Sequence, residues 1–367
     1  MKILGVNSAI LPDHNKQSQV DWWRVHRPLQ ELKKHVDWQI DEAPSFIVGL
    51  NKNMKMEEFT EAEMEKAFKK LCEYDIVFAS YHPDPTSYTM LKVARDKAGT
   101  QFVMDCDDDM FAINPDNPFW MKMTDEKVYW MQRMIADNDW LTTPSPLLAT
   151  EFRKRRKQKA NTLRVIPNYL PKSYYHPPFD NGNDIVIGYM GGSSHYADLH
   201  DSGALDAIAQ IMHEYKNVRF KSVGMILDKY TPVQRTEFDG GKRGQAFFDE
   251  VYPNMKMDIA IGPLLDNIFN RGKSNIKWQE MTRAGAVFVG SNVGPYKSLE
   301  DGKTAFLVEN NQESWYDALK QLVGHKDERV TMLENAQAEL EKNWTLEKNW
   351  DKYKTFFEEV YDNKTSE

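Results

Sequence analysis

The segment that decides the fold is DIAIGPLLDNIFNRGKSNIKWQEMTRAGAVFVGSNVGPYKSLEDGKTAFLVENN, residues 258–311. Its apolar run 259–261 is followed by Gly and Pro, which predicts a buried strand that ends there. A polar loop is expected over 266–272, and a helix then runs to a stop at Gly285. The apolar run 286–289 predicts the next strand. This strand–helix–strand order is typical of a parallel sheet covered by helices.

The charges of the central helix are placed unusually. Lys273, Lys277 and Glu280 follow the spacing i, i+4, i+7, so they share one face. Ser274 or Asn275 is positioned to cap the helix. Cations near a helix start are disfavoured by the macrodipole, but a phosphate bound there would reverse the penalty. The alternative is a solvated helix face with a Lys–Glu pair.

Length and composition limit the number of domains and the class of protein. The 367 residues are enough for two domains, and 41% hydrophobic with 28% charged residues is a globular profile. The net charge of −8 does not favour a broad nucleic-acid-binding surface. The two cysteines, Cys72 and Cys106, form no disulfide framework or metal-binding pattern, so we expect a reduced cytoplasmic protein. No apolar run approaches the roughly 18 residues of a membrane span.

Strands and helices alternate along the whole chain. We expect an α/β protein with two Rossmann-like, doubly wound domains that face a central cleft. The Pro-, Tyr- and Asn-rich stretch 171–183 is the clearest composition break. It divides an N-terminal domain (1–170) from a C-terminal domain (184–343), and a last helix is expected in 344–367.

A glycine-rich loop opens the second domain. A β-branched strand over 185–190 runs into Gly191-Gly192-Ser193, whose backbone is able to approach a phosphate closely. Such a pair of glycines also occurs in ordinary turns.

These motifs together resemble the donor-binding half of GT-B glycosyltransferases, especially the retaining family 4. The resemblance implies that Glu280 holds the ribose of a nucleotide sugar and that basic residues near the helix start hold its diphosphate. The first Glu of the family's Glu-x7-Glu pattern falls on Gly272, so the usual sugar contact is not carried over. It also implies a last helix that crosses back onto the first domain.

The same resemblance assigns further positions. The Gly-Gly-Ser loop and His195 would face the donor's phosphates or sugar, and Arg24, after the first loop, would lie on the acceptor side. The implied donor-binding residues are Gly191, Gly192, Ser193, His195, Gly224, Met225, Pro263, Leu264, Lys273, Asn275, Lys277, Glu280 and Tyr296.

An acidic cluster follows the strand over 101–104. Asp105-Cys106-Asp107 is similar to the Asp-x-Asp that holds a divalent metal in GT-A glycosyltransferases, yet a GT-B enzyme needs no such metal. The other interpretations are capping and solvated carboxylates, or a catalytic or acceptor-binding carboxylate, for which Asp107 and Asp108 are the candidates. His82, after a neighbouring strand, is either structural or a substrate contact.

Five consecutive basic residues end a helix predicted over 147–157. The simplest interpretation is a solvated face, and the alternative is contact with an anionic surface such as membrane or DNA. The residues are Arg153, Lys154, Arg155, Arg156 and Lys157.

The sequence therefore predicts a glycosyltransferase that moves a sugar from a UDP- or GDP-linked donor to an unidentified acceptor, with retention, and without a metal or other cofactor. Two alternatives remain. One is a sugar-nucleotide epimerase or hydrolase of the same fold. The other is a non-catalytic sugar-nucleotide- or glycan-binding protein, which the missing Glu at Gly272 would favour. The acceptor would be a glycan, a lipid, a protein or a modified nucleobase.

Overall fold

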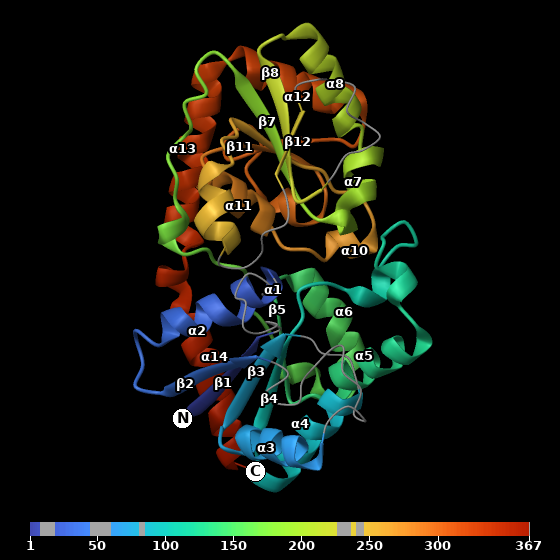
Figure 1. The fold of residues 1–367 in the computed structure, drawn as a ribbon, viewed down its shortest axis with the longest axis vertical. Helices are drawn as coiled ribbons and strands as arrows, with labels where there is room; N and C mark the ends of the chain where they lie inside the picture. The colour runs from blue at the N-terminus through green and yellow to red at the C-terminus, as the bar shows by residue number, and fades with distance from the viewer. Residues whose placement is uncertain (8–18, 45–59, 81–84, 226–235, 240–245, 367) are drawn as a thin grey trace.

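The computed structural model describes residues 1–7, 19–44, 60–80, 85–225, 236–239 and 246–366. These residues form two α/β lobes that follow one another along the long axis of the molecule (Figure 1). Each lobe is built on a parallel sheet with six described strands. The predicted pair of doubly wound domains is confirmed.

The first lobe has the strand order β2-β1-β3-β4-β5-β6. The central strands carry apolar side chains on both faces because helices cover both sides, as parallel sheets require, whereas the edge strand β2 is more polar. The strands are β1 (Lys2–Asn7), β2 (Gln39–Pro44), β3 (Ile76–Ser80), β4 (Gln101–Asp105), β5 (Trp140–Thr143) and β6 (Leu163–Val165).

The helices of the first lobe begin with a continuous segment of mixed geometry. Asp21 ends helix α1, which starts at Gln19, and the π-helical turn follows it directly. The helices are α1 (Gln19–Asp21), the π-helical η2 (Trp22–His26), α2 (Arg27–Leu32), α3 (Glu61–Cys72), α4 (Pro85–Ala98), η5 (Met110–Ala112), η6 (Trp120–Lys122), α5 (Asp125–Asp137), α6 (Pro146–Arg156) and η7 (Lys157–Thr162).

The second lobe has the strand order β12-β11-β10-β7-β8-β9. The predicted strands over 259–261 and 286–289 are both present and pair with one another in parallel. The strands are β7 (Ile185–Met190), β8 (Val218–Val223), β9 (Thr236–Asp239), β10 (Ile259–Gly262), β11 (Val287–Ser291) and β12 (Phe306–Val308).

One expectation for the second lobe is wrong. The segment 266–272, predicted as a loop, contains the one-turn helix α10, because the Asn267 side chain accepts a hydrogen bond from the Asn270 backbone N–H. The helical segments, with the linker turn η8 first, are η8 (Lys172–Tyr174), η9 (Ser193–His195), α7 (Tyr196–Asp201), α8 (Ala204–Glu214), the π-helical η10 (Phe247–Val251), η11 (Tyr252–Asn254), α10 (Ile268–Arg271), α11 (Ile276–Arg283), η12 (Gly294–Ser298), α12 (Gln312–Gly324) and α13 (Lys326–Asn343).

Gly285 ends α11 as the sequence predicted. Its φ of +87° belongs to the left-handed region, and a Cβ there would lie 2.7 Å from the carbonyl oxygen of Pro177. Only glycine therefore fits this position without strain. The close contact also ties the end of α11 to the linker between the lobes.

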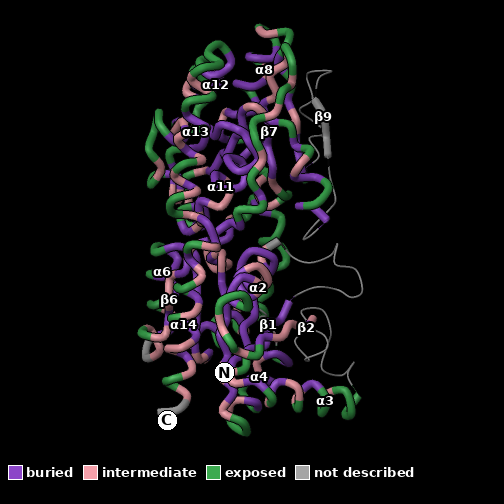
Figure 2. The backbone as a smooth tube through the Cα atoms, turned by 90° about the vertical axis from the view of Figure 1, so that its left-hand side faces the viewer, coloured by how far each residue is buried: buried purple, intermediate pink, exposed green. Residues whose placement is uncertain are grey.

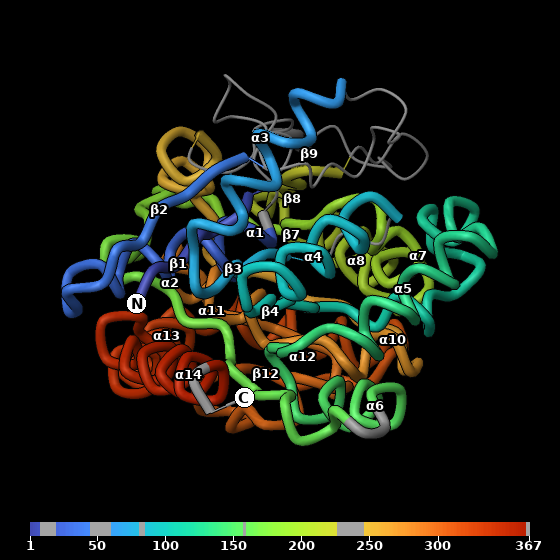
Figure 3. Tube along the Cα trace, turned by 90° about the horizontal axis from the view of Figure 1, so that it is seen from below, coloured from blue at the N-terminus to red at the C-terminus, as the bar shows by residue number. Residues whose placement is uncertain are grey.

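The last helix, α14 (Leu346–Ser366), returns to the first lobe. Its residues Tyr353, Phe356 and Phe357 are buried in one cluster with Ile3 and Phe78 of the first sheet. Figures 1 and 3 show α13 and α14 following one another along the same side of the molecule. The predicted crossing of the last helix is confirmed, and it fastens the two lobes together.

Burial follows this layered plan. The strands of both sheets lie in the interior, while the outer helices alternate buried and exposed residues (Figure 2). A separate aromatic cluster joins the lobes. Trp23 of η2 packs edge-on against Tyr174 of the linker and Phe248 of the second lobe, with ring centroids 5.5 and 4.6 Å apart. These ring contacts therefore fix the position of one lobe relative to the other.

Candidate functional site

A cavity of about 310 Å³ lies between the lobes. It collects residues that follow strands of both sheets, as expected for ligand sites of open parallel sheets. Most of the described lining residues were already singled out from the sequence. The lining residues are Val20, Trp23, Arg24, Asp107, Asp108, Asn168, Gly191, Gly192, Ser194, His195, Leu264, Lys273, Ser274, Ile276, Lys277, Glu280 and Tyr296.

The start of α11 faces this cavity without a side-chain cap. Asn275 occupies the N-cap position, but its side chain accepts no hydrogen bond from the first turn and instead accepts one from Gln279 at 2.9 Å. The expected cap is thus absent, and backbone N–H groups of the first turn stay available. Lys273 and Lys277 line the same space. Donors, helix dipole and ammonium groups therefore converge as an anion site requires.

The glycine loop after β7 lines the same cavity as this helix end. Gly191 and Gly192 line the cavity, and nothing lies within 4 Å of where a Cβ of Gly192 would be. Gly224, after β8, has φ +89° and would place a Cβ 2.9 Å from the Gly191 carbonyl oxygen. Gly224 thus supports the loop from behind rather than lining the cavity. Ser193 starts η9 and is exposed.

His195 is held by a specific partner. Its Nδ1 lies 2.8 Å from Oδ2 of Asp198, whose Oδ1 accepts from the backbone N–H of Leu265 at 2.9 Å and from Asn270 at 2.6 Å. Burial, together with the nearby positive charge of Lys273, lowers the pKa of His195. The ring is therefore neutral at pH 7 and fixed in orientation.

The carboxyl ends of β10 and β11 close one wall of the cavity. Leu264 and Tyr296 line it, and both are almost fully buried. The Leu264 backbone N–H donates to Ser291, and Asn310 donates to the Leu264 carbonyl oxygen at 2.8 Å. Pro263 and Met225 are buried and do not line the cavity. This wall is therefore formed by buried side chains and by a loop that is hydrogen-bonded at Leu264.

Glu280 is engaged from the other lobe. Nε1 of Trp23 donates to its Oε1 at 2.9 Å, and the ammonium of Lys277 lies 3.6 Å from its Oε2. The carboxylate is 4% exposed and lines the cavity. The predicted ribose-binding residue therefore also joins the two lobes, which the sequence did not reveal.

The acidic cluster after β4 divides into three different environments. Asp105 is buried in a bidentate pair with Arg24, at 2.9 and 2.7 Å. Asp108 lies 3.1 Å from the ammonium of Lys273 across the cavity. Asp107 forms no hydrogen bond or ion pair within the described part of the chain. Burial, and then the negative charges of Asp108 and Asp105, raise the pKa of Asp107 to about 7.

These environments do not fit the metal-binding interpretation of Asp105-Cys106-Asp107. Asp105 directs both oxygens at the Arg24 guanidinium, so the two carboxylates are not arranged as a common metal site. No group of three or more His, Cys, Asp or Glu side chains suited to a metal occurs within the described ranges.

Arg24 lines the cavity but is 1% exposed. Besides Asp105, its Nη1 donates to the Ile166 carbonyl oxygen at 2.6 Å and to Asn168 at 3.2 Å. Asn168 in turn donates to Ser274 at 2.7 Å, so the network continues into the second lobe. The guanidinium of Arg24, which the sequence assigned to the acceptor side, thus belongs to a buried hydrogen-bond network at the cavity wall.

The interpretation of the basic helix as one solvated face is wrong. Arg156 is 2% exposed and donates to the carbonyl oxygens of Ile135 and Asn138, at 2.8 and 3.0 Å. The Arg155 guanidinium lies 3.8 Å from the centre of the Phe111 ring. Arg153 and Lys154 are exposed. The Lys157 side chain lies outside the described residues, as does His82.

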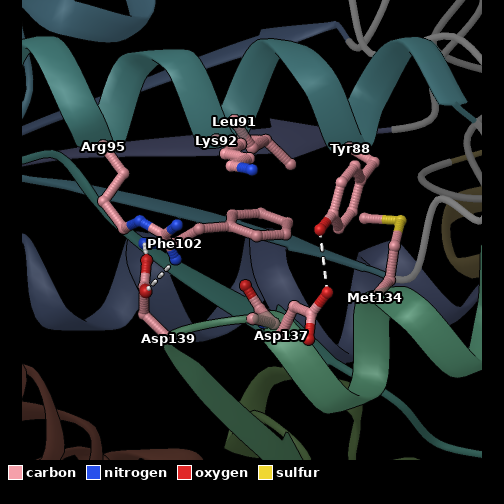
Figure 4. A pocket seen from close by; sticks show the side chains of 9 residues that line it. Tyr88, Leu91, Lys92, Arg95, Phe102, Met134, Asp137 and Asp139 are labelled. Atoms are coloured by element: carbon pink, nitrogen blue, oxygen red, sulfur yellow. Dashed lines mark hydrogen bonds and ion pairs between the residues drawn. The ribbon is translucent and has the colours of Figure 1, made fainter.

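Another pocket lies away from this site, between α4 and α5 (Figure 4). Three of its charged groups already have partners, because Arg95 pairs with Asp139 at 3.0 Å and Tyr88 donates to Asp137 at 2.8 Å. Its volume of about 30 Å³ holds little more than one water molecule.

Two parallel-sheet lobes, an interlobe cavity and a returning last helix define the GT-B fold. Among solved structures, the chain is similar to Alr3699/HepE of Anabaena in complex with UDP and glucose, at 14% identity over 100% of both chains and a TM-score of 0.63. It is also similar to the sucrose-phosphate synthase of Thermosynechococcus elongatus, at 13% identity over 99% and 100% of the two chains and a TM-score of 0.66.

A glycosyltransferase from Rickettsia africae is similar at 15% identity over 99% of both chains, with a TM-score of 0.66. No protein-family model and no curated protein matches the sequence. At these identities the similarity establishes the fold. No helix among the described residues is long and apolar enough to cross a bilayer.

Proposed function

We propose that this protein is a glycosyltransferase that takes its sugar from a nucleotide-linked donor. The observation that carries the proposal is the uncapped start of α11 with Lys273 and Lys277, which lines the interlobe cavity together with Gly191 and Gly192. This arrangement suits a diphosphate. The buried wall at Leu264 suits the base, and UDP is the first base to test because the Anabaena structure holds UDP.

The chemistry needs stabilisation of a leaving group. The acceptor oxygen forms a bond to the anomeric carbon, and the bond from that carbon to the phosphate oxygen breaks. Its electron pair leaves with the nucleoside diphosphate, where negative charge develops. Lys273, Lys277 and the N–H groups of α11 lie where fixed positive potential lowers the barrier. The surrounding lobes exclude water and so limit hydrolysis of the donor.

We propose retention of the anomeric configuration, as the resemblance to family 4 implies. The acceptor proton then passes to the departing phosphate, and Asp107 accepts a hydrogen bond from the acceptor hydroxyl. One observation favours the second candidate, inversion. Asp107 is unpaired, and its pKa of about 7 matches that of a general base working near neutrality. The anomeric coupling constant of the product, measured by NMR, decides between them.

The donor site is tested by thermal unfolding with UDP, GDP, ADP and TDP and their sugar conjugates. A ligand at about 100 times its dissociation constant stabilises by roughly 2.7 kcal/mol. We expect one nucleotide to stabilise the wild type and to stabilise Glu280→Gln less, because the ribose hydroxyls lose a charged acceptor. The amide retains an oxygen for Trp23, so the variant tests ribose binding rather than folding.

Absence of any nucleotide effect would contradict the donor-site assignment. Products formed from the donor alone separate the remaining activities. Sugar transfer that depends on an added acceptor supports the proposal. An epimerised sugar, or rapid hydrolysis that no acceptor diverts, would instead support the epimerase or hydrolase. Binding without any turnover would support a binding protein, which Gly272 in place of a Glu would explain.

A further inference from the structure

A second cavity, of about 330 Å³, lies beside the interlobe cavity and is lined mainly by residues of the first lobe. Its wall is formed mainly by aromatic and other apolar side chains, so we call it the aromatic cavity. The apolar lining residues are Val20, Cys106, Met110, Phe111, Ile113, Phe119, Met131, Ile135, Phe152 and Phe269. Its volume is in the range of small-molecule sites.

The aromatic cavity meets the interlobe cavity at a carboxylate. Asp107 and Asp108, with Val20 and Ser194, line both spaces. Asp108 is paired with Lys273, whereas Asp107 has no hydrogen-bonding partner among the described residues. A molecule in the aromatic cavity therefore reaches the sugar site through the unpaired carboxylate.

The other polar groups of the aromatic cavity are already committed. Both oxygens of Asp105 accept from Arg24, and the Ser80 hydroxyl donates to Asp21. Asn117 donates to the Ser194 carbonyl oxygen at 3.2 Å and accepts from the Phe119 backbone N–H at 3.0 Å. A polyhydroxylated occupant would therefore bury hydroxyls without partners, which is costly.

The apolar wall continues to the surface at one side. Phe119 lines the cavity and is 42% exposed, and the next residues, Trp120 and Met121, are 48% and 84% exposed. From the second lobe, α10 contributes Phe269 to the wall and packs against η5. The segment between β4 and α5 lies beside α10 in Figure 1. The cavity is thus closed by both lobes and open beside Phe119.

We propose that the aromatic cavity binds the apolar body of the acceptor, an amphiphile that presents one hydroxyl at Asp107. This inference rests on the proposed function and names the acceptor class for it. An apolar alkyl or aromatic group fills the space between Met110, Phe111 and Ile113, and leaves the hydroxyl facing the donor. The committed polar groups disfavour an oligosaccharide in the same place.

The test compares octyl β-glucoside with methyl β-glucoside, which carry the same hydroxyls and differ in the apolar body. Binding is followed by NMR of methyl-labelled methionines in the presence of UDP, below the micelle concentration. Met110 and Met131 line the cavity and report directly. We expect their signals to shift with the octyl compound, with a dissociation constant at least about tenfold below that of the methyl compound.

Two variants link this binding to the cavity. Met110→Gln and Phe119→Ser change partly exposed wall residues, so the fold should tolerate them. We expect each to weaken octyl glucoside binding by about tenfold. Tyr129→Ser is the matched control, because Tyr129 is 56% exposed and lines neither cavity. It should leave the binding unchanged.

Octyl glucoside that shifts neither methionine, or that binds the two cavity variants as tightly as the wild type, would overturn the inference. So would transfer of sugar to methyl glucoside as efficient as transfer to the octyl compound. Transfer to dioleoylglycerol in phosphatidylcholine vesicles supports a membrane-resident amphiphile, and transfer to octyl glucoside a soluble one. The UDP-dependent thermal shift is measured separately, so failure of the donor assignment is distinguished from failure of the acceptor class.

Discussion

The two faces of the interlobe cavity are built in different ways. The second-lobe face consists of backbone turns, an uncapped helix and two lysines, most of them within the segment 258–311. The first-lobe face is assembled from distant parts of the chain. Arg24 and Asp105, 81 residues apart, form its buried ion pair, and Asn168 extends that network towards the second lobe.

The two kinds of construction suit two different tasks, phosphate binding and acceptor binding. A phosphate-binding face needs fixed dipoles and charge, which a strand–loop–helix unit supplies locally. An acceptor-binding face needs a carboxylate held at a chosen protonation state, and its neighbours set that state. Of the three carboxylates in residues 105–108, two are paired and one is left unpaired. Substitutions in the two faces should therefore have different effects on stability and on turnover.

The largest expected effect is on stability, from Arg24→Ala. Removing one partner of a buried ion pair leaves Asp105 charged and uncompensated, which costs about 3–5 kcal/mol. Chemical denaturation should show this loss of unfolding free energy. The exposed Arg133→Ala serves as the control and should change little.

A double variant sharpens this result. Replacing both partners, Arg24→Leu with Asp105→Leu, removes the uncompensated charge and should recover much of the lost stability. Normal stability of Arg24→Ala together with a raised KM for the acceptor would contradict the structural role. That outcome would support the direct acceptor contact expected from the sequence.

The second effect is on turnover, from Lys273→Ala. In the proposed reaction its ammonium faces the developing charge, so its loss should lower kcat by about 10²- to 10³-fold. Lys297→Ala is the matched control, because Lys297 is exposed and lines neither cavity. Steady-state kinetics with the identified donor measure both. Turnover within a factor of two of wild type would remove Lys273 from the donor site.

The local construction of the second-lobe face explains why the sequence predicted it well. The strand, helix and glycine stop of 258–311 depend on neighbours in sequence, and most residues named there line the cavity. The two places in this segment where the structure differs from the prediction also have local causes. The one-turn helix α10 depends on the Asn267 side chain, and Asn275 turns its oxygen to Gln279 instead of capping.

The first-lobe face depends on contacts that no local pattern contains. Asp108 finds its partner Lys273 165 residues away, and Trp23 reaches Glu280 across 257 residues. The sequence named Asp107 and Asp108 without a basis for choosing between them. The burial of Arg156 could have been predicted from the sequence. Phe152 and Arg156 are four residues apart, so they share one side of α6, and that side is buried.

The smallest of the rate effects, and the one that best tests the acceptor face, comes from Asp107→Asn. If Asp107 assists the acceptor hydroxyl, the loss should be about 10²-fold in kcat/KM. Its pKa of about 7 predicts that wild-type activity rises with pH through 7, as the carboxylate forms. The variant should lose this rise. Asp116→Asn, an exposed carboxylate in the same segment, is the control.

Thermal stability is a second measurement on the Asp107→Asn variant, and we expect it to rise where the activity falls. Because the folded state raises the pKa of Asp107, the folded chain keeps a proton that the unfolded chain has lost. This group therefore makes the free energy of unfolding fall as pH rises from about 4 to 7. Asp107→Asn removes that penalty, so the variant should melt at a higher temperature than wild type at pH 8 while turning over more slowly. A variant that loses both stability and activity would mean that Asp107 supports the structure, and the acceptor face would then lack its proposed carboxylate.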